Sequence, residues 1–137
     1  MANSVYGKAK QNILNGNINF SSNQYKVLLV KSSLYSININ THENVSDIPV
    51  SAIVARSLPL NNVTNTLGVV DGDDLIITLN SNQSFDAVVL YQNGTTDANS
   101  KLIFYIDTAE GLPYPGSLDQ INVNIVWSNN SIKILSL

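Results

Sequence analysis

Hydrophobic residues near the start of the 137-residue chain recur with the period of an α-helix. The apolar residues between Asn3 and Gly16 lie at four-residue spacing or directly beside such positions: Val5, Tyr6, Ala9, Ile13 and Leu14. This spacing places them along one stripe of a helix. Asn3 or Ser4 can cap its start, and Gly16 lies where a C-terminal cap belongs. We therefore predict one short amphipathic helix, whose stripe covers either its own domain or a neighbouring protein.

After this helix, the hydrophobic pattern changes to the short runs that are typical of β-strands. These runs are bounded by Asn, Gly, Ser or Pro and cover residues 25–31, 34–39, 51–58, 75–79, 85–91, 101–107, 121–127 and 132–137. The run 25–31 is apolar on both faces, which predicts a fully buried strand. The run 121–127 alternates, so that Ile121, Val123, Ile125 and Trp127 share one face. The turn signal "SNNS" at 128–131 then predicts a C-terminal hairpin between 121–127 and 132–137.

Seven to nine short strands at nearly regular spacing predict an all-β fold, either an antiparallel β-sandwich or a small barrel, with one short N-terminal helix. We divide the chain into an N-terminal helix or arm, residues 1–20, and a single β domain, residues 21–137. Two long loops, around 40–51 and 108–120, are expected to carry contacts with partners because long loops on a β scaffold usually do.

Charge is scarce in this chain. Only 12% of residues are Asp, Glu, Lys or Arg, against about 25% in a typical domain. With 44% hydrophobic residues, disorder is not favoured. Either a biased codon usage or a surface that faces other protein explains the composition, since interface cores are depleted in charge. The net charge of −3 and the scattered lysines exclude a nucleic-acid binder.

The chain also lacks the signals of several other classes. It has no cysteine, which excludes disulfides, thiolate nucleophiles and Cys-ligated zinc. No run approaches the roughly 20 apolar residues of a membrane span, and the start has no secretory signal. We therefore expect no membrane partner. The glycines form no phosphate-binding loop, so we expect no cofactor.

The stretch "VVDGDDL", Val69 to Leu75, is the segment that most resembles a chemical site. It is compatible with a calcium site, a pair of catalytic acids or a turn between two strands. An EF-hand loop that began at Asp71 would need glutamate at its twelfth position, where Asn82 stands. Two catalytic carboxylates need environments that separate their pKa values, which adjacent turn residues do not provide. We predict a turn between strands, with Gly72 at positive φ, and no metal site.

His42 is the only histidine, so any Ser-His-Asp arrangement would have to include it. No G-x-S-x-G elbow supplies a nucleophile, and one histidine cannot form a multi-histidine metal site. We therefore predict that His42 hydrogen-bonds locally and that the protein has no catalytic residues. Tyr114, in the loop "LPYPG", is expected to be exposed.

Several segments, which together span nearly the whole chain, resemble the sequence pattern of a known group of proteins. In order they are "MANSVYGKAKQNILNGNINF", "YKVLLV", "THENVSDIP", "GVVDGDDL" and "KLIFYIDTAEGLPYPGSLDQINVNIVWSNNSIKILSL". The most specific parts are "THE...DIP", the acidic turn and "YID...GLP" followed by the Trp-bearing segment. This pattern resembles a widespread group of small virion proteins of tailed bacteriophages. The resemblance implies a β-rich structural subunit of the virion without enzymatic activity.

Position in the virion remains open between the head and the tail. The first hypothesis is a capsid decoration, or cement, protein that forms a homotrimer and binds the major capsid protein. The second is a tail or fibre component that contacts other tail proteins or host glycans. Residues 1–20 and the 40–51 loop are the expected docking elements. The candidate interface residues are Val5, Tyr6, Ala9, Ile13, His42 and Tyr114.

Overall fold

The computed structural model describes residues 3–20, 24–79, 83–109, 111–116, 122–127 and 135–136. Within these ranges most secondary structure is antiparallel β-sheet, and α1 (Gly7–Leu14) is the single α-helix. The prediction of an all-β fold with one N-terminal helix is confirmed. The described strands form layered sheets and do not close into a barrel.

The largest sheet has five strands in the order β1-β8-β7-β2-β3. Their bounds are Ser4–Val5 (β1), Lys101–Ile106 (β8), Ala87–Gln92 (β7), Tyr25–Val30 (β2) and Ile53–Arg56 (β3). The two central strands, β2 and β7, are buried along almost their whole length. Because successive side chains of a strand point to opposite faces, this sheet must be covered on both sides. The prediction of a fully buried strand at 25–31 is confirmed for Tyr25–Val30.

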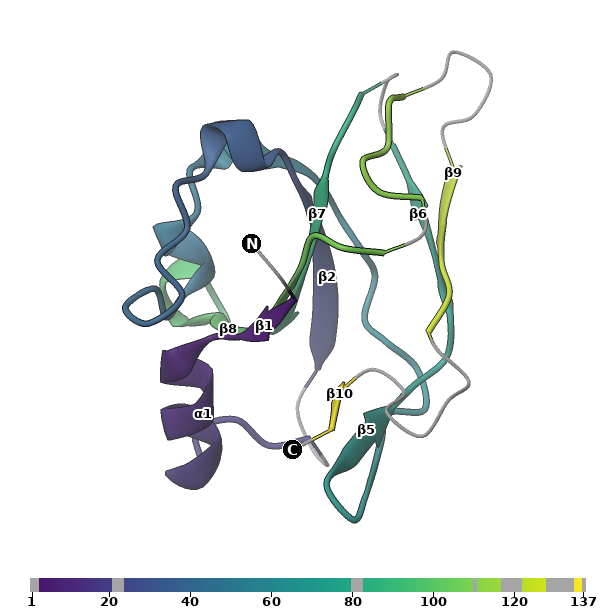
Figure 1. Ribbon diagram of the computed structural model, residues 1–137. Coiled ribbons are helices and arrows are strands. Elements are labelled where there is room, and N and C mark those ends of the chain that lie inside the picture. Colours follow the sequence, from purple (N-terminus) through teal and green to yellow (C-terminus); the bar gives the residue numbers. More distant parts are fainter. Residues whose placement is uncertain are drawn as a thin grey trace.

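The covering layers differ on the two sides of this sheet (Figure 1). On one side lie α1 and the segment with the 3-10 helices Ser32–Leu34, Val45–Asp47 and Val50–Ala52. On the other side lies a two-stranded sheet of β6 (Leu75–Thr78) and β9 (Asn122–Ile125). A three-stranded sheet, β10-β5-β4, lies below it. Its strands are Leu135–Ser136 (β10), Val69–Asp71 (β5) and Thr64–Thr66 (β4).

The helix begins at Gly7, four residues later than predicted. Ser4 and Val5 instead pair with Tyr105 and Phe104 of β8 as a short edge strand. The Asn3 side chain does not cap the helix, because its oxygen accepts the backbone N–H groups of residues 107 and 108. The other end is as predicted. Gly16 has φ +79 and its N–H bonds to the carbonyl of residue 13, the left-handed conformation that glycine adopts cheaply.

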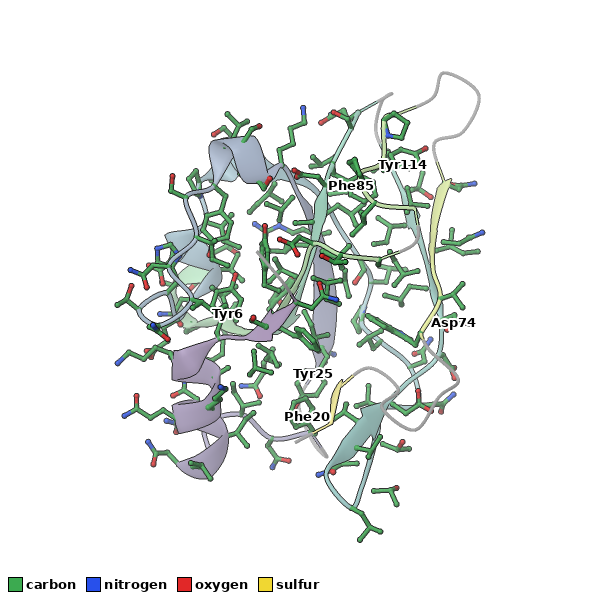
Figure 2. The ribbon with its side chains drawn as sticks, in the orientation of Figure 1. Tyr6, Phe20, Tyr25, Asp74, Phe85 and Tyr114 are labelled. Atoms are coloured by element: carbon green, nitrogen blue, oxygen red, sulfur yellow. The ribbon has the colours of Figure 1, made fainter. Side chains whose placement is uncertain are left out.

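The N-terminal segment is part of the hydrophobic core. Tyr6 and Ala9 are fully buried, and Ile18 and Phe20 nearly so. The ring of Phe20 stacks on that of Tyr25 in β2, with centroids 5.0 Å apart (Figure 2). Residues 3–20 therefore belong to the same core as the five-stranded sheet.

Two of the predicted strand arrangements are wrong. Residues 34–39 form no strand, since Ser32–Leu34 is a 3-10 helix followed by irregular backbone. In the described residues 122–127 and 135–136, the predicted C-terminal hairpin is not formed either. β9 pairs with β6, whereas β10 pairs with β5 in a different sheet. The predicted turn at 128–131 lies outside the described residues.

A hairpin that the sequence did not reveal joins β4 and β5. Thr66 and Val69 pair across a two-residue turn of Leu67 and Gly68, which have φ values of 51 and 81. Positive φ at both positions is the signature of a type I′ turn. Gly72, for which positive φ was expected, does not have it. The glycine with that role in this region is Gly68.

Leu67 is poorly suited to its position in this turn, which yields a stability prediction. It is 98% exposed, and a left-handed conformation is costly for leucine but tolerated by asparagine. We expect Leu67→Asn to raise the free energy of unfolding by about 0.5–1 kcal/mol, measured from urea midpoints. The matched control is Leu58→Asn, since Leu58 is 80% exposed without positive φ. An equal response of the two variants would contradict the turn assignment.

Candidate interaction surfaces

The acidic stretch 71–74 holds Trp127 in place. The backbone N–H of Trp127 donates to Asp74 Oδ1 at 2.8 Å, and its indole Nε1–H donates to the carbonyl oxygen of Asp73 at 3.0 Å. The Asn62 side chain donates to Asp73 Oδ2 at 2.7 Å. Figure 2 shows Asp74 at the end of the β6–β9 sheet. Residues 72–74 lie between two strands, β5 and β6, as predicted, but they form no turn, and the two strands belong to different sheets.

Within the described ranges, no group of three or more His, Asp or Glu residues is arranged to hold a metal ion. The carboxylates of Asp73 and Asp74 accept hydrogen bonds from the chain itself. Their arrangement is that of an anchor between the end of β9 and the start of β6.

We predict that Trp127→Ala lowers the free energy of unfolding by roughly 3–5 kcal/mol. The side chain is 7% exposed and belongs to the core. Trp127→Phe keeps most of the ring but loses the indole donor, so we expect a smaller loss of roughly 1–2 kcal/mol. Urea denaturation of the three proteins measures both differences. If the midpoint of Trp127→Ala barely moved, Trp127 would not be a core residue.

A chain of hydroxyl groups links the core to His42. The hydroxyls of Tyr6 and Tyr35 are 3.1 Å apart, and the Tyr35 hydroxyl is 2.8 Å from His42 Nδ1. The backbone N–H of Asn38 also donates to Nδ1, at 3.2 Å, so this nitrogen is an acceptor. The rings of Tyr35 and His42 stack, with centroids 5.4 Å apart. His42 therefore bonds locally, as predicted, and fixes the 38–42 turn to the core.

The tyrosines of this cluster stay protonated at neutral pH. Burial, as the largest cause, raises the pKa of Tyr35 to about 12 and that of Tyr105 to about 12. Burial and the neighbouring Tyr35 raise the pKa of Tyr6 far above its ordinary value. Tyr6 and Tyr35 pack in the core and hydrogen-bond to each other there.

The 40–51 loop is tied to β8 and stiffened by Asp47. The N–H groups of Glu43 and Asn44 both donate to Asp47 Oδ2, at 2.8 and 3.0 Å. Backbone bonds from Leu102 to Glu43 and from Val45 to Ser100 join the loop to β8 and the residue before it. Burial alone raises the pKa of Asp47, but the two amide hydrogen bonds and the nearby His42 outweigh it, so the pKa lies below its ordinary value.

The lowered pKa of Asp47 predicts how loop stability depends on pH. A carboxyl whose pKa is lower in the folded state stabilises the fold above its unfolded pKa, and this contribution disappears as pH falls through the folded pKa. Unfolded Asp has a pKa of about 3.9. We expect Asp47→Asn to lower the urea midpoint at pH 7, with the difference from wild type closing below about pH 3. Ser46→Ala, at an exposed neighbour without a titrating group, should differ from wild type equally at both pH values. A difference for Asp47→Asn that is independent of pH would contradict this role.

The N-terminal segment and the 40–51 loop meet at the surface. The N–H of Gly7 donates to the carbonyl of Ile39 at 2.7 Å. A Cβ on Gly7 would lie 3.3 Å from Asn40 Cα, so the close approach favours glycine there. An open hollow lies at this junction, lined by Ser4, Val5, Gly7, Lys10, Ile39 and Asn40. We call these residues the N-terminal surface.

The candidate interface residues have different positions in the structure. Tyr6 and Ala9 are fully buried in the chain's own core, because the helix stripe packs on the five-stranded sheet. They are therefore not available to a partner while the helix is packed. Ile13 and His42 are half-buried. Only Val5 lines the N-terminal surface.

Tyr114 is also held by the chain, and the expectation that it is exposed is not met. It is half-buried, and its ring stacks on Phe85 with centroids 4.9 Å apart (Figure 2). Its backbone N–H and carbonyl exchange hydrogen bonds of 2.7 and 3.0 Å with those of Phe85. This pairing fixes the 111–116 segment beside the strand that leads into β7.

Charge is distributed unequally between the two sides of the molecule. Each described Lys or Arg lies on α1 or in, or directly after, a strand of the five-stranded sheet: Lys8, Lys10, Lys26, Lys31, Arg56 and Lys101. The ion pairs Arg56–Asp97 (2.8 Å) and Lys101–Glu43 (3.4 Å) are on this side. By contrast, the sequence has no charged residue at 57–70, 75–85 or 120–132.

The charge-free segments carry exposed apolar side chains. Four of the seven large hydrophobic residues that are exposed in the described chain lie there: Leu58, Leu67, Ile76 and Val126. Sequence reasoning did not single out these residues, although the long uncharged runs were visible in the sequence.

Comparisons with known proteins add no relative. No protein-family model matches the chain, and no curated protein sequence matches it. None of the helices in the described ranges is long and apolar enough to cross a membrane.

Proposed function

We propose that the protein is a structural subunit of the virion of a tailed bacteriophage, and that it decorates the outside of the capsid. Its partner is the major capsid protein, which it binds as a homotrimer. The resemblance of the sequence to small virion proteins motivates this function. Tail location is the competing position.

The observation that carries the proposal is the junction of the two predicted docking elements. Residues 4–10 of the N-terminal segment meet Ile39 and Asn40, at the start of the 40–51 loop, in the N-terminal surface, where the Gly7 N–H bonds to the Ile39 carbonyl. This surface combines apolar side chains, a lysine and hydrogen-bonding groups. Such a mixture suits a protein–protein contact. It also lies on elements fixed by core packing, so binding costs little ordering entropy.

Decoration stabilises a capsid through binding energy alone. A protein that binds the assembled shell, and not its dissociated subunits, shifts the equilibrium toward the shell. At a free concentration 100 times the dissociation constant, each bound site contributes about 2.7 kcal/mol. Many sites on one shell add up, so a modest affinity per site is sufficient.

The test is the release of packaged DNA on heating, for particles that lack the protein and for particles to which it is added back. We expect particles to assemble without it but to release DNA at lower temperature, and wild-type protein to restore the release temperature. Lys10→Glu, on the N-terminal surface, should require about tenfold more protein for the same restoration. Lys26→Glu makes the same charge change on β2, outside this surface, and should act like wild type.

Two results would overturn the proposal. Identical release curves with and without the protein would show that it does not stabilise the head. If particles without the protein instead adsorbed poorly to host cells, the protein would be assigned to the tail.

A further inference from the structure

The outer surface of the β6–β9 sheet has an unusual composition for a face exposed to water. Its residues alternate with the buried Ile77 and Val123 and are all exposed: Ile76, Thr78, Asn122, Asn124 and Val126. Ile76 and Val126 are each 69% exposed. We call these five residues the outer β6–β9 face. It contains no charged group, and Ile76 pairs directly with Asn124 across the two strands.

We infer that the outer β6–β9 face packs against the same face of a second copy of this chain. This contact joins copies in pairs about a two-fold axis in solution, so it is distinct from the homotrimer proposed for the capsid-bound protein, and it holds whether or not the chain is a virion subunit. Two features favour a copy over another partner, and both follow from the chemistry of the five residues.

The first feature is self-complementary hydrogen bonding. Asn and Thr side chains each carry both donors and acceptors, so a face of Asn and Thr can bond to an identical face. The Thr78 hydroxyl already donates to Asn122 Oδ1 at 2.8 Å across the strands. A face built on lysines or carboxylates would instead require a partner of opposite charge.

The second feature is electrostatic. Each copy has a net charge of −3, so copies repel where their charged surfaces meet. The described strand pair β6–β9 has no charge of its own, and the carboxylates that directly precede β6 in the sequence, Asp73 and Asp74, are tied to Asn62 and Trp127. An uncharged face also exerts no long-range electrostatic attraction that would speed its encounter with a partner. Such a face therefore suits a partner that is already at high local concentration, such as another copy.

The size of the face sets the expected strength of association. A standard interface has about 20–30 residues on each side, and the outer β6–β9 face has far fewer. We therefore expect a reversible equilibrium between monomer and dimer, with the same residues of each copy meeting around a two-fold axis.

The test is sedimentation velocity of the purified full chain over a hundredfold range of concentration. We expect the average mass to rise above the monomer value of 14.9 kDa. Ile76→Lys and Ile76→Glu, each tested alone, should stay monomeric, because like charges then face each other. An equimolar mixture of the two should associate again, since opposite charges meet. Val50→Lys is the matched control, because Val50 is 80% exposed but lies in a 3-10 helix outside this face, and it should associate like wild type.

Circular dichroism checks that each variant is folded. If one is not, Asn124→Asp replaces Ile76→Glu or Asn124→Lys replaces Ile76→Lys, since Asn124 lies on the same face. A wild-type protein that stays monomeric over the whole range would overturn the inference. So would association that Ile76→Lys does not weaken, or that Val50→Lys weakens equally. Failure of the mixture to associate would show that the face binds a region other than itself and would also overturn it.

Discussion

The structure depends on the burial of both faces of the central β2–β7 pair. These two strands are apolar on both sides, so a single sheet with one solvated face is excluded for this sequence. Each face must be covered, and the two covers have different chemistry. One is formed by α1 and the 3-10 segments, and the other by short strands that are stabilised mainly by their packing against the sheet.

The way in which each covering layer packs on the central sheet determines which side chains stay exposed. Tyr6 and Ala9 face inward, so the outer side of the helical cover presents the rim between β1, α1 and the 39–40 turn. The Tyr6–Tyr35–His42 chain ties the 38–42 turn at that rim to the core. On the opposite side, Ile77 and Val123 face inward, and the alternation of a strand then forces Ile76 and Asn124 outward. The polarity of the two surfaces proposed for binding thus follows from what the core requires.

Local pattern predicted those parts of the fold that local physics decides. Residues close in sequence determine three of these features. They are the run at 25–30 that is apolar on both faces, the alternation around Val123 and Trp127, and the left-handed conformation of Gly16. The pairing of strands is not set in this way. The run 121–127 and the C-terminal run had suitable patterns and a turn signal between them, yet each found a partner from residues 69–78, because alternation specifies a face and not a neighbour.

The remaining differences also have physical causes. Residues 34–39 resemble a strand, but the hydroxyl of Tyr35 bonds to the buried Tyr6 and the half-buried His42, and these tertiary contacts take precedence over local propensity. The β4–β5 hairpin escaped prediction because Leu67 stands where Asn usually starts a type I′ turn. The buried candidate interface residues were chosen because they lie on the apolar stripe of the helix. Such a stripe predicts burial, but it does not tell whether the helix packs on a partner or on the chain's own sheet. The outer β6–β9 face could be found only after the pairing of β6 with β9 was known.

The most direct test of the division of the molecule into two binding sides is an image of the virion by electron cryo-microscopy. The protein should appear as density on the outside of the capsid, with the N-terminal surface toward the shell and the outer β6–β9 faces of adjacent copies in contact. Density for this chain in the tail and none on the head, or copies on the head whose β6–β9 faces point separately into solvent, would contradict it.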